Sequence, residues 1–313
     1  MSRDDDERGA GPARDPGPER PAHQLVRTRS GALAMRSLIA DEVMHPGVGP
    51  LEEAQRLYVG QAHLGARLRA SGSRAGESVA PHQARLVLFD VGMGAGSNAA
   101  AAFGESARAP DGAARLELVS FERDLGALRL ALTEPAAFGL QGACGEAARA
   151  LLESGRHESI RTLWRLELGD AAEALARQPH AADIVFWDPF SPRINPGLWT
   201  VSAFSLLRQV AGPRCTLFTY SASTAVRLAL LLAGWTVGIG DAIGDKATTT
   251  AAAMHGDDLA RPLDATWLRR LARADVPLPA DAPADAVQRV AALPQFAFTP
   301  RGPGGTSPAP GSR

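Results

Sequence analysis

Short apolar runs alternate with alanine-rich amphipathic stretches from Arg85 onward, and this alternation dominates the hydrophobic pattern of the chain. The apolar runs predict buried strands, and the stretches with apolar positions three or four residues apart predict helices. The predicted strands cover 85–90, 116–121, 163–168, 183–187, 215–220, 235–239 and a last one near 246–253. The predicted helices between them cover 97–105, 124–133, 143–153, 171–177, 200–210 and 223–233.

This order of elements predicts an α/β fold. Strands that alternate with helices form βαβ units with a parallel sheet and right-handed crossovers. The last two predicted strands are joined by a short Gly/Asp-rich turn, so they are expected to pair antiparallel, because a parallel connection needs about a dozen residues. A doubly wound, seven-stranded, mostly parallel sheet with an antiparallel last strand resembles the Rossmann-like methyltransferase fold.

The chain outside this domain divides by composition. Its first residues are charged and rich in Pro and Gly, without the apolar stretch of a signal peptide. After them we expect a hairpin over 25–38 and a helix from Leu51 to about Arg69, with Pro50 and acidic residues at its start. The expected segments are a disordered tail (1–23), an N-terminal extension with a linker (24–82), the α/β domain (83–255), a C-terminal extension anchored by Trp267 and Leu268 (256–298) and a disordered tail (299–313).

Charge and cysteine content exclude several classes of protein. The formal net charge of −1 argues against a protein held to nucleic acid by a global positive field, although not against a local basic face. Cys144 and Cys215 are far apart and have no metal-ligand spacing, so we expect buried thiols, no zinc site and no disulfide. No segment has the ~18 uninterrupted apolar residues of a membrane helix. A cytoplasmic protein is the expectation.

A glycine-rich loop follows the first strand of the α/β domain. Gly92, Gly94 and Gly96 come directly after Asp90, and Asn98 stands at the start of the next helix. Glycines permit a tight turn and the close approach of a ligand, and a helix N-terminus binds carboxylates or phosphates. Folds that bind NAD, FAD or S-adenosyl-L-methionine (SAM) all use such loops, so the glycines alone do not select the cofactor.

Three carboxylates at strand ends favour SAM, and the analogy with the methyltransferase fold supports them. Asp90 would balance the cationic methionine end of that cofactor but would repel a pyrophosphate. Glu122 closes the next strand, where it can accept both ribose hydroxyls, as in NAD enzymes too. Asp170 follows the third strand and is a candidate for reading the adenine amino group, although it could also be a simple helix N-cap.

The strand at 183–187 ends in Asp188 at the edge where open α/β sheets bind ligands. Pro189 and Pro192 restrict the backbone beyond it, so the carboxylate is held in place. We expect Asp188 to orient an amine by hydrogen bonding; a turn-capping aspartate is the alternative. Phe190 and Trp199 could stack a flipped-out base, although core packing is the more usual role of a tryptophan at helical spacing.

The same segment carries a family resemblance. Its residues resemble the Asp-x-Phe-x-Pro-x-x-Asn-Pro-x-x-Trp pattern of MnmC-like methyltransferases, and the likeness spans roughly residues 25–255. These enzymes methylate the aminomethyl group on the wobble uridine of certain tRNAs. The resemblance implies a stand-alone methyltransferase without the fused FAD-dependent oxidase, which uses SAM and binds a tRNA anticodon loop. It implies Asp188 as the catalytic residue and the following substrate-binding residues: Phe190, Pro192, Asn195, Trp199 and Lys246.

Departures from the family pattern leave the substrate open. Asp90 replaces the usual glutamate, Pro189 replaces a glycine, and Ala247 stands where an arginine usually follows the lysine. A methyltransferase of a small amine, a non-catalytic cofactor-binding partner of a modifying oxidase and a dinucleotide oxidoreductase are the alternatives. Arg193, Arg227 and Lys246, the only lysine of the chain, could contact phosphates or simply form surface ion pairs. His45 could border the site, but a structural role is the preferred interpretation.

Overall fold

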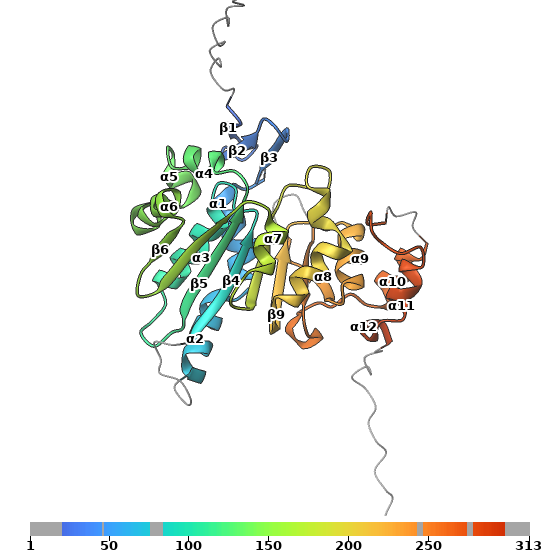
Figure 1. The fold of residues 1–313 in the computed structure, drawn as a ribbon. Coiled ribbons are helices and arrows are strands. Elements are labelled where there is room, and N and C mark those ends of the chain that lie inside the picture. Colours follow the sequence, from blue (N-terminus) through green and yellow to red (C-terminus); the bar gives the residue numbers. More distant parts are fainter. Residues whose placement is uncertain (1–20, 46, 76–83, 243–246, 274–277, 298–313) are drawn as a thin grey trace, which may run out of the picture.

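A computed structural model describes residues 21–45, 47–75, 84–242, 247–273 and 278–297 of the protein (Figure 1). Residues 1–20 and 298–313, which make up nearly all of the expected tails, lie outside the described residues, as does most of the predicted linker. So do residues 243–246 of the Gly/Asp-rich turn, which include Lys246. No helix in the described ranges combines the length and the hydrophobicity that crossing a membrane requires.

A central sheet of eight strands, counted over the described residues, organises the α/β domain. Its strands are β4 (Arg85–Val91), β5 (Arg115–Glu122), β6 (Arg156–Glu158), β7 (Thr162–Leu168), β8 (Ala182–Trp187), β9 (Ala211–Thr219), β10 (Thr236–Gly240) and β11 (Thr249–Ala253). Their order is β10-β11-β9-β8-β4-β5-β7-β6. The doubly wound, mostly parallel sheet is confirmed, but the expected number of seven strands is wrong by one. The short polar edge strand β6, which pairs antiparallel with β7, has no hydrophobic pattern to reveal it.

The last strand has the expected direction. β11 lies between β9 and β10 and pairs antiparallel with both, with Thr250 opposite Thr219 and Gly240 opposite Thr249. β4, β5, β7, β8 and β9 run parallel to one another. The carboxyl ends of these five strands therefore meet at one edge of the sheet, where the loops gather.

Alternating side chains of the strands form two cores, one on each face of the sheet. In β4, Leu86 and Leu88 belong to the first core, and Val87, Phe89 and Val91 belong to the second. The helices that contribute to the first core are α1 (Pro50–Glu53), η1 (Ala54–Gly60), α2 (Leu64–Ala75), α3 (Ser97–Ala107), α4 (Gly126–Ala131), α5 (Pro135–Phe138) and α6 (Gly142–Ser154). Those of the second are α7 (Ala171–Ala176), the 3₁₀ helix η3 (Pro196–Trp199), α8 (Val201–Gln209), α9 (Thr224–Leu232), α10 (Ala265–Leu271), α11 (Ala286–Ala291) and α12 (Pro294–Ala297).

The N-terminal extension forms a small antiparallel sheet of β1 (His23–Arg27), β2 (Leu33–Ser37) and β3 (Glu42–Met44). The predicted hairpin is confirmed as β1 and β2, and β3 was not expected. In Figure 1 this blue sheet stands beside α4 and above the top of the central sheet. It is thereby close to the loops at the carboxyl ends of the strands.

The long helix expected after Pro50 is interrupted. It divides into α1, the π-helix η1 and α2, and His63 adopts a φ of 49° in the turn before α2. The wide π turn buries Ala54, Leu57 and Tyr58 against the first core. It closes at Gly60, where a Cβ would lie 2.9 Å from the carbonyl oxygen of Gln55. The apolar spacing does not distinguish such a turn from a regular helix.

The C-terminal extension packs on the second core. Trp267 stacks on Phe296 with ring centroids 6.0 Å apart and an interplanar angle of 11°. Trp267 and Leu268 are both partly buried against the second core, so their predicted anchoring role is confirmed. Cys144 and Cys215 are buried free thiols, also as expected.

Candidate active site

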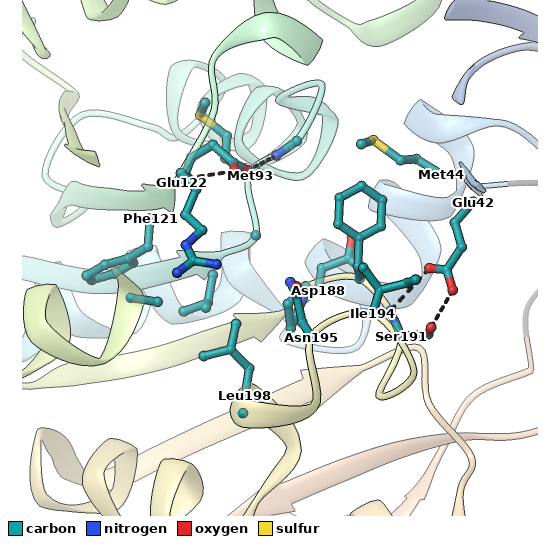
Figure 2. Close-up of a pocket in the computed structure, with 18 of the residues that line it drawn as sticks. Glu42, Met44, Met93, Phe121, Glu122, Asp188, Ser191, Ile194, Asn195 and Leu198 are labelled. Atoms are coloured by element: carbon teal, nitrogen blue, oxygen red, sulfur yellow. Dashed lines mark hydrogen bonds between the residues drawn. The ribbon is translucent and has the colours of Figure 1, made fainter. Parts of the chain in front are cut away.

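A cavity of about 490 Å³ lies at the carboxyl ends of β4, β5, β7 and β8 (Figure 2). The loops after these strands form most of its wall, and β3 of the N-terminal sheet closes one side. Figure 2 shows Glu42 and Met44 of β3 facing Asp188 and Ile194 of the loop after β8. The cavity therefore stands where open α/β sheets bind their ligands.

At Gly92 the glycine loop touches the loop after β8. Gly92 has a φ of 86°, and a Cβ there would lie 2.7 Å from the backbone of Asp188 and Pro189. Gly94 also has positive φ and faces Met44. Both glycines line the cavity. Gly96, the N-cap of α3, instead lies beneath Leu128.

Asp90 lies behind the glycine loop and is absent from the cavity lining. Its side chain is fully buried and accepts a hydrogen bond of 2.9 Å from Ser120 Oγ, which in turn accepts one from Trp164 Nε1. Burial raises the pKa of Asp90 to about 7. The carboxylate is thus held in the first core, one layer below the position at which a ligand would touch it.

Three buried oxygen atoms near the loop have no hydrogen-bond partner among the described residues. They are Asp90 Oδ1, Ser97 Oγ and Asn98 Oδ1. Buried polar atoms in folded proteins are nearly always satisfied by protein, water or ligand. These atoms could be satisfied by a bridging water, since none of the three residues lines the cavity itself.

Glu122 and Asp170 both line the cavity and are both fixed by backbone amides. Glu122 accepts hydrogen bonds from the backbone N–H of Gly94, over 2.7 Å, and of Arg123, over 2.7 Å. Asp170 is the N-cap of α7 and accepts from the N–H of Ala172 and Glu173. The N-cap interpretation of Asp170 is confirmed, and it does not prevent a ligand contact because a carboxylate has further lone pairs.

Asp188 is at the centre of the site. Its Oδ2 accepts a hydrogen bond of 2.7 Å from Asn98 Nδ2 and lies 3.9 Å from His45 Nε2. The side chain is 11% exposed, and burial raises its pKa, whereas His45 and Tyr58 act in the opposite direction. Asn98, which the sequence assigned to the cofactor, therefore contacts the predicted catalytic residue and does not line the cavity.

His45 lies between two carboxylates, a position that sequence reasoning did not favour. Its Nδ1 is 3.7 Å from Glu53 Oε2, on α1, and its side chain is only 12% exposed. The backbone at His45 has a φ of 55°, which is uncommon for a residue other than glycine. Both His45 and Glu53 line the cavity.

The motif after β8 divides between cavity and core. Phe190 and Asn195 line the cavity, whereas Pro192 is exposed outside it. Trp199 is 4% exposed, donates a hydrogen bond of 2.9 Å from Nε1 to the carbonyl of Phe190 and meets Tyr220 edge to face. The core-packing interpretation of Trp199 is confirmed, and base stacking by this residue is wrong because its ring is covered.

Arg193 and Arg227, the two arginines that could contact phosphates, differ in their exposure. Arg227 is buried and donates to Thr250 Oγ1 and to the carbonyl of Thr249, so it ties α9 to β11 and cannot meet a phosphate. Arg193 is 66% exposed, next to the cavity mouth, and forms an ion pair of 3.2 Å with Glu42. Lys246 lies outside the described residues.

Several lining residues escaped sequence reasoning, among them Glu42, Tyr220, Ser191 and Ile194. Glu42 accepts hydrogen bonds from the hydroxyl and the backbone N–H of Ser191, as Figure 2 shows. Tyr220 donates to the carbonyl of Pro189 over 3.1 Å. These contacts join segments that are distant in sequence, so no local sequence pattern predicts them.

Acidic side chains outnumber basic ones in the described lining. The acidic residues are Glu42, Glu53, Glu122, Asp170 and Asp188, and the basic ones are His45 and Arg123. Such a lining attracts cations, because each carboxylate contributes a negative potential in a partly desolvated space. The arrangement suits a cationic cofactor together with an amine.

Comparison with known proteins agrees with this geometry. Residues 150–255 match a family described as S-adenosyl-L-methionine-dependent methyltransferase. Two relatives are the tRNA 5-methylaminomethyl-2-thiouridine biosynthesis bifunctional proteins MnmC of Methylibium petroleiphilum and Pseudomonas fluorescens. The first is 29% identical over 72% of this chain and 34% of the relative, and the second is 31% identical over 79% and 36%. The chain thus spans about a third of the length of these relatives.

A solved structure resembles nearly the whole chain. The crystal structure of MnmC2 from Aquifex aeolicus superposes with a TM-score of 0.64 and 26% sequence identity. The similarity covers 88% of this chain and 87% of that protein. The chain thus carries a segment of the S-adenosyl-L-methionine-dependent methyltransferase family at residues 150–255, and it is similar to MnmC proteins over most of its length.

Proposed function

We propose that the protein methylates the aminomethyl group on the wobble uridine of tRNA. The observation that carries the proposal is the position of Asp188: a buried carboxylate, oriented by Asn98, at the centre of an acidic cavity. It stands on the segment that resembles the MnmC motif. The names of the curated relatives, which refer to tRNA 5-methylaminomethyl-2-thiouridine biosynthesis, support the same substrate.

SAM fits the residues of the cavity. The glycine loop at Gly92 and Gly94, which lines the cavity, would receive the methionine end, and Asp90 buried behind it would balance its charge. Glu122 would accept the ribose hydroxyls and Asp170 would contact the adenine amino group. When bound, the cofactor supplies an electrophilic methyl group.

The amine must attack as the free base. With an unperturbed pKa near 10, deprotonation at pH 7 costs about 4 kcal/mol. Asp188 would accept a hydrogen bond from the amine and orient its lone pair, which makes positioning the main contribution of the protein. Because burial raises the pKa of Asp188, this carboxylate is also a better proton acceptor than an exposed aspartate.

The tRNA would approach from the side of the N-terminal sheet and the loop after β8. Phe190 and Asn195 line the cavity near Asp188 and would contact the uracil, with Pro192 at the rim. Arg193 and Lys246 would meet anticodon-loop phosphates. We further propose that residues 83–255 form the methyltransferase domain, that 24–82 complete its substrate side and that the protein acts in the cytoplasm.

The test is mass spectrometry of tRNA nucleosides from a strain that lacks the gene. Loss of the methylaminomethyl-uridine nucleoside and accumulation of its unmethylated precursor are expected. Wild-type protein should restore the methylated nucleoside, whereas D188A and D188N should not. An unchanged nucleoside profile in the deletion strain, or near wild-type single-turnover rates for both variants, would contradict the proposal.

The acidic lining favours one second candidate, the methylation of a small amine. Arg123 is the single arginine in the described lining, and a nucleotide substrate would usually find more positive charge. The two candidates are separated by comparing transfer to undermethylated tRNA with transfer to free aliphatic amines. A preference for the free amine that persists in the presence of tRNA would favour the small substrate.

A further inference from the structure

Each ring nitrogen of His45 faces a different carboxylate. Nε2 lies 3.9 Å from Asp188 Oδ2, and Nδ1 lies 3.7 Å from Glu53 Oε2. The three side chains come from the segment after β3, from α1 and from the loop after β8, so folding of the whole domain brings Asp188 to the other two. All three line the cavity, and His45 and Glu53 are little exposed.

His45 has an uncommon backbone conformation, which it shares with Asp41 and His63. His45 holds a φ of 55°, a conformation that costs a non-glycine side chain about 1 kcal/mol or more. The Nε2–Asp188 and Nδ1–Glu53 separations exceed hydrogen-bond length, as is common for catalytic groups before substrate binds. The strained backbone thus places an imidazole directly behind Asp188.

We propose that His45, oriented by Glu53, is the positioning residue that takes up, through Asp188, the proton released by the substrate amine. This inference rests on the proposed methylation of an amine and adds the destination of the proton. The neutral ring carries its proton on Nδ1, toward Glu53, and presents the Nε2 lone pair to Asp188.

Methyl transfer forms one nitrogen–carbon bond and breaks one carbon–sulfur bond, whose electron pair stays on sulfur, while one proton leaves the nitrogen. Asp188 accepts that proton and transfers it to His45 Nε2, and the resulting imidazolium is stabilised by Glu53. The cation returns its proton to solvent before the next turnover.

Other ionisable groups near His45 also favour a positive charge there. The groups around the His45–Asp188 pair are Glu42 on β3, Glu53 on α1, Tyr58 on η1, Asp90 on β4, Glu122 on β5 and Tyr220 after β9. Burial and the carboxylates raise the pKa of Tyr58 and of Tyr220, so both stay neutral near pH 7. Apart from Arg123, which lines the same cavity, and Arg193, which pairs with Glu42, the described groups around an imidazolium at His45 are anions and neutral hydroxyls.

Two substitutions preserve the fold at this position. Asparagine and glycine both accept the positive φ, so H45N and H45G remove the imidazole without adding backbone strain. His63 provides a matched control, because it has a φ of 49°, is exposed and does not line the cavity. H63N and H63G should behave like the wild type.

The kinetic test measures single-turnover methyl transfer to undermethylated tRNA between pH 6 and 9. H45N should lower the rate about 100-fold near pH 7, with less loss at pH 9, and leave tRNA affinity within about twofold. Added imidazole should restore H45G at least several-fold but leave H63G unaffected. A pH-independent loss without imidazole rescue would mean a structural role and would overturn the proposal, as would a rate for H45N within twofold of the wild type.

A second measurement needs no methyl acceptor. The titration of the His45 ring, assigned by comparison with H45N in an NMR spectrum, should have its midpoint lowered in E53Q and in D188N. Unchanged midpoints in both would overturn the coupling on which the proposal depends. Failure of the proposed function is seen separately, as the absence of transfer to tRNA by the wild-type protein.

Discussion

Asn98 Nδ2 donates a hydrogen bond of 2.7 Å to Asp188 Oδ2, and this contact joins the helix after the glycine loop to the loop after β8. Asn98 itself is buried at the start of α3. The region expected to bind the cofactor and the residue expected to bind the amine are therefore held in one rigid relation. Any displacement of α3 changes the direction of the Asp188 carboxylate.

Replacement of Asn98 should impair catalysis more than cofactor binding. N98A removes a hydrogen bond to a charged group, which is worth about 1.5–3 kcal/mol, so the single-turnover rate should fall about 10- to 100-fold. N98D should be worse, because a second carboxylate raises the pKa of Asp188 further and repels it. Calorimetric titration with SAM serves as the control. An unchanged rate in N98A would show that the contact does not orient Asp188.

Asp90 should make the stability of the cofactor-free protein depend on pH. Burial raises its pKa from 3.8 to about 7, so its contribution to stability is complete below pH 4 and is lost as the pH rises to about 7. That loss amounts to at most about 4 kcal/mol of the free energy of unfolding. D90N, which can keep the Ser120 hydrogen bond, should therefore be more stable than the wild type at pH 8.

The same substitution should weaken binding of the cationic cofactor. Thermal unfolding at pH 5 and pH 8 checks the stability of D90N, and calorimetry checks its affinity for SAM. Wild-type and D90N unfolding curves that shift in parallel between the two pH values would contradict the raised pKa.

Glu42 should control the loop after β8 from the N-terminal sheet. E42A removes the acceptor for the Ser191 hydroxyl and N–H and the ion pair with Arg193. The expected result is a loss of about 10-fold in methyl transfer with SAM affinity retained, because the affected loop carries the amine-binding residues. D41N, which removes an exposed ion pair with Arg36 on the same segment, is the matched control and should be nearly silent. Equal effects of E42A and D41N would show that the contacts of Glu42 with Ser191 and Arg193 do not specifically control the loop after β8.

Trp199 should act through packing and through its hydrogen bond to Phe190. W199F keeps the edge-to-face contacts but loses the Nε1 donor, so stability should fall by about 1 kcal/mol and the catalytic rate by a few-fold. W199A opens a cavity and should cost about 3–5 kcal/mol. Chemical denaturation measures the free energy of unfolding of both variants. Quenching of Trp199 fluorescence by tRNA, judged against W199F, would instead indicate stacking on a base.

Local signals were sufficient for most of the sheet and for the loops at its edge. The runs that became β4, β5 and β8 are apolar and are followed by Gly92, Glu122 and Asp188, so both strand and ligand-facing end could be predicted. The antiparallel β11 followed from the shortness of its connection to β10. In contrast, β6 has only three residues and no apolar pattern.

The details of the site depend on contacts between distant segments. Sequence spacing could not reveal that Asn98 faces Asp188, that Trp199 is covered or that Arg227 is buried beneath β11. His45 stands in a turn with no periodicity, and its position between Glu53 and Asp188 exists only once three segments have packed. The sequence shows which charged groups the site contains, but it does not show which of them pair.

The position of β11 has a consequence for synthesis on the ribosome. β10 is made before β11, yet β11 fills the place between β9 and β10. Until residues 249–253 leave the exit tunnel, β9 presents an unpaired edge and β10 has no partner in the sheet. The nascent chain can therefore assemble the strands from β4 to β9 first. The sheet is completed only when β11 inserts between β9 and β10.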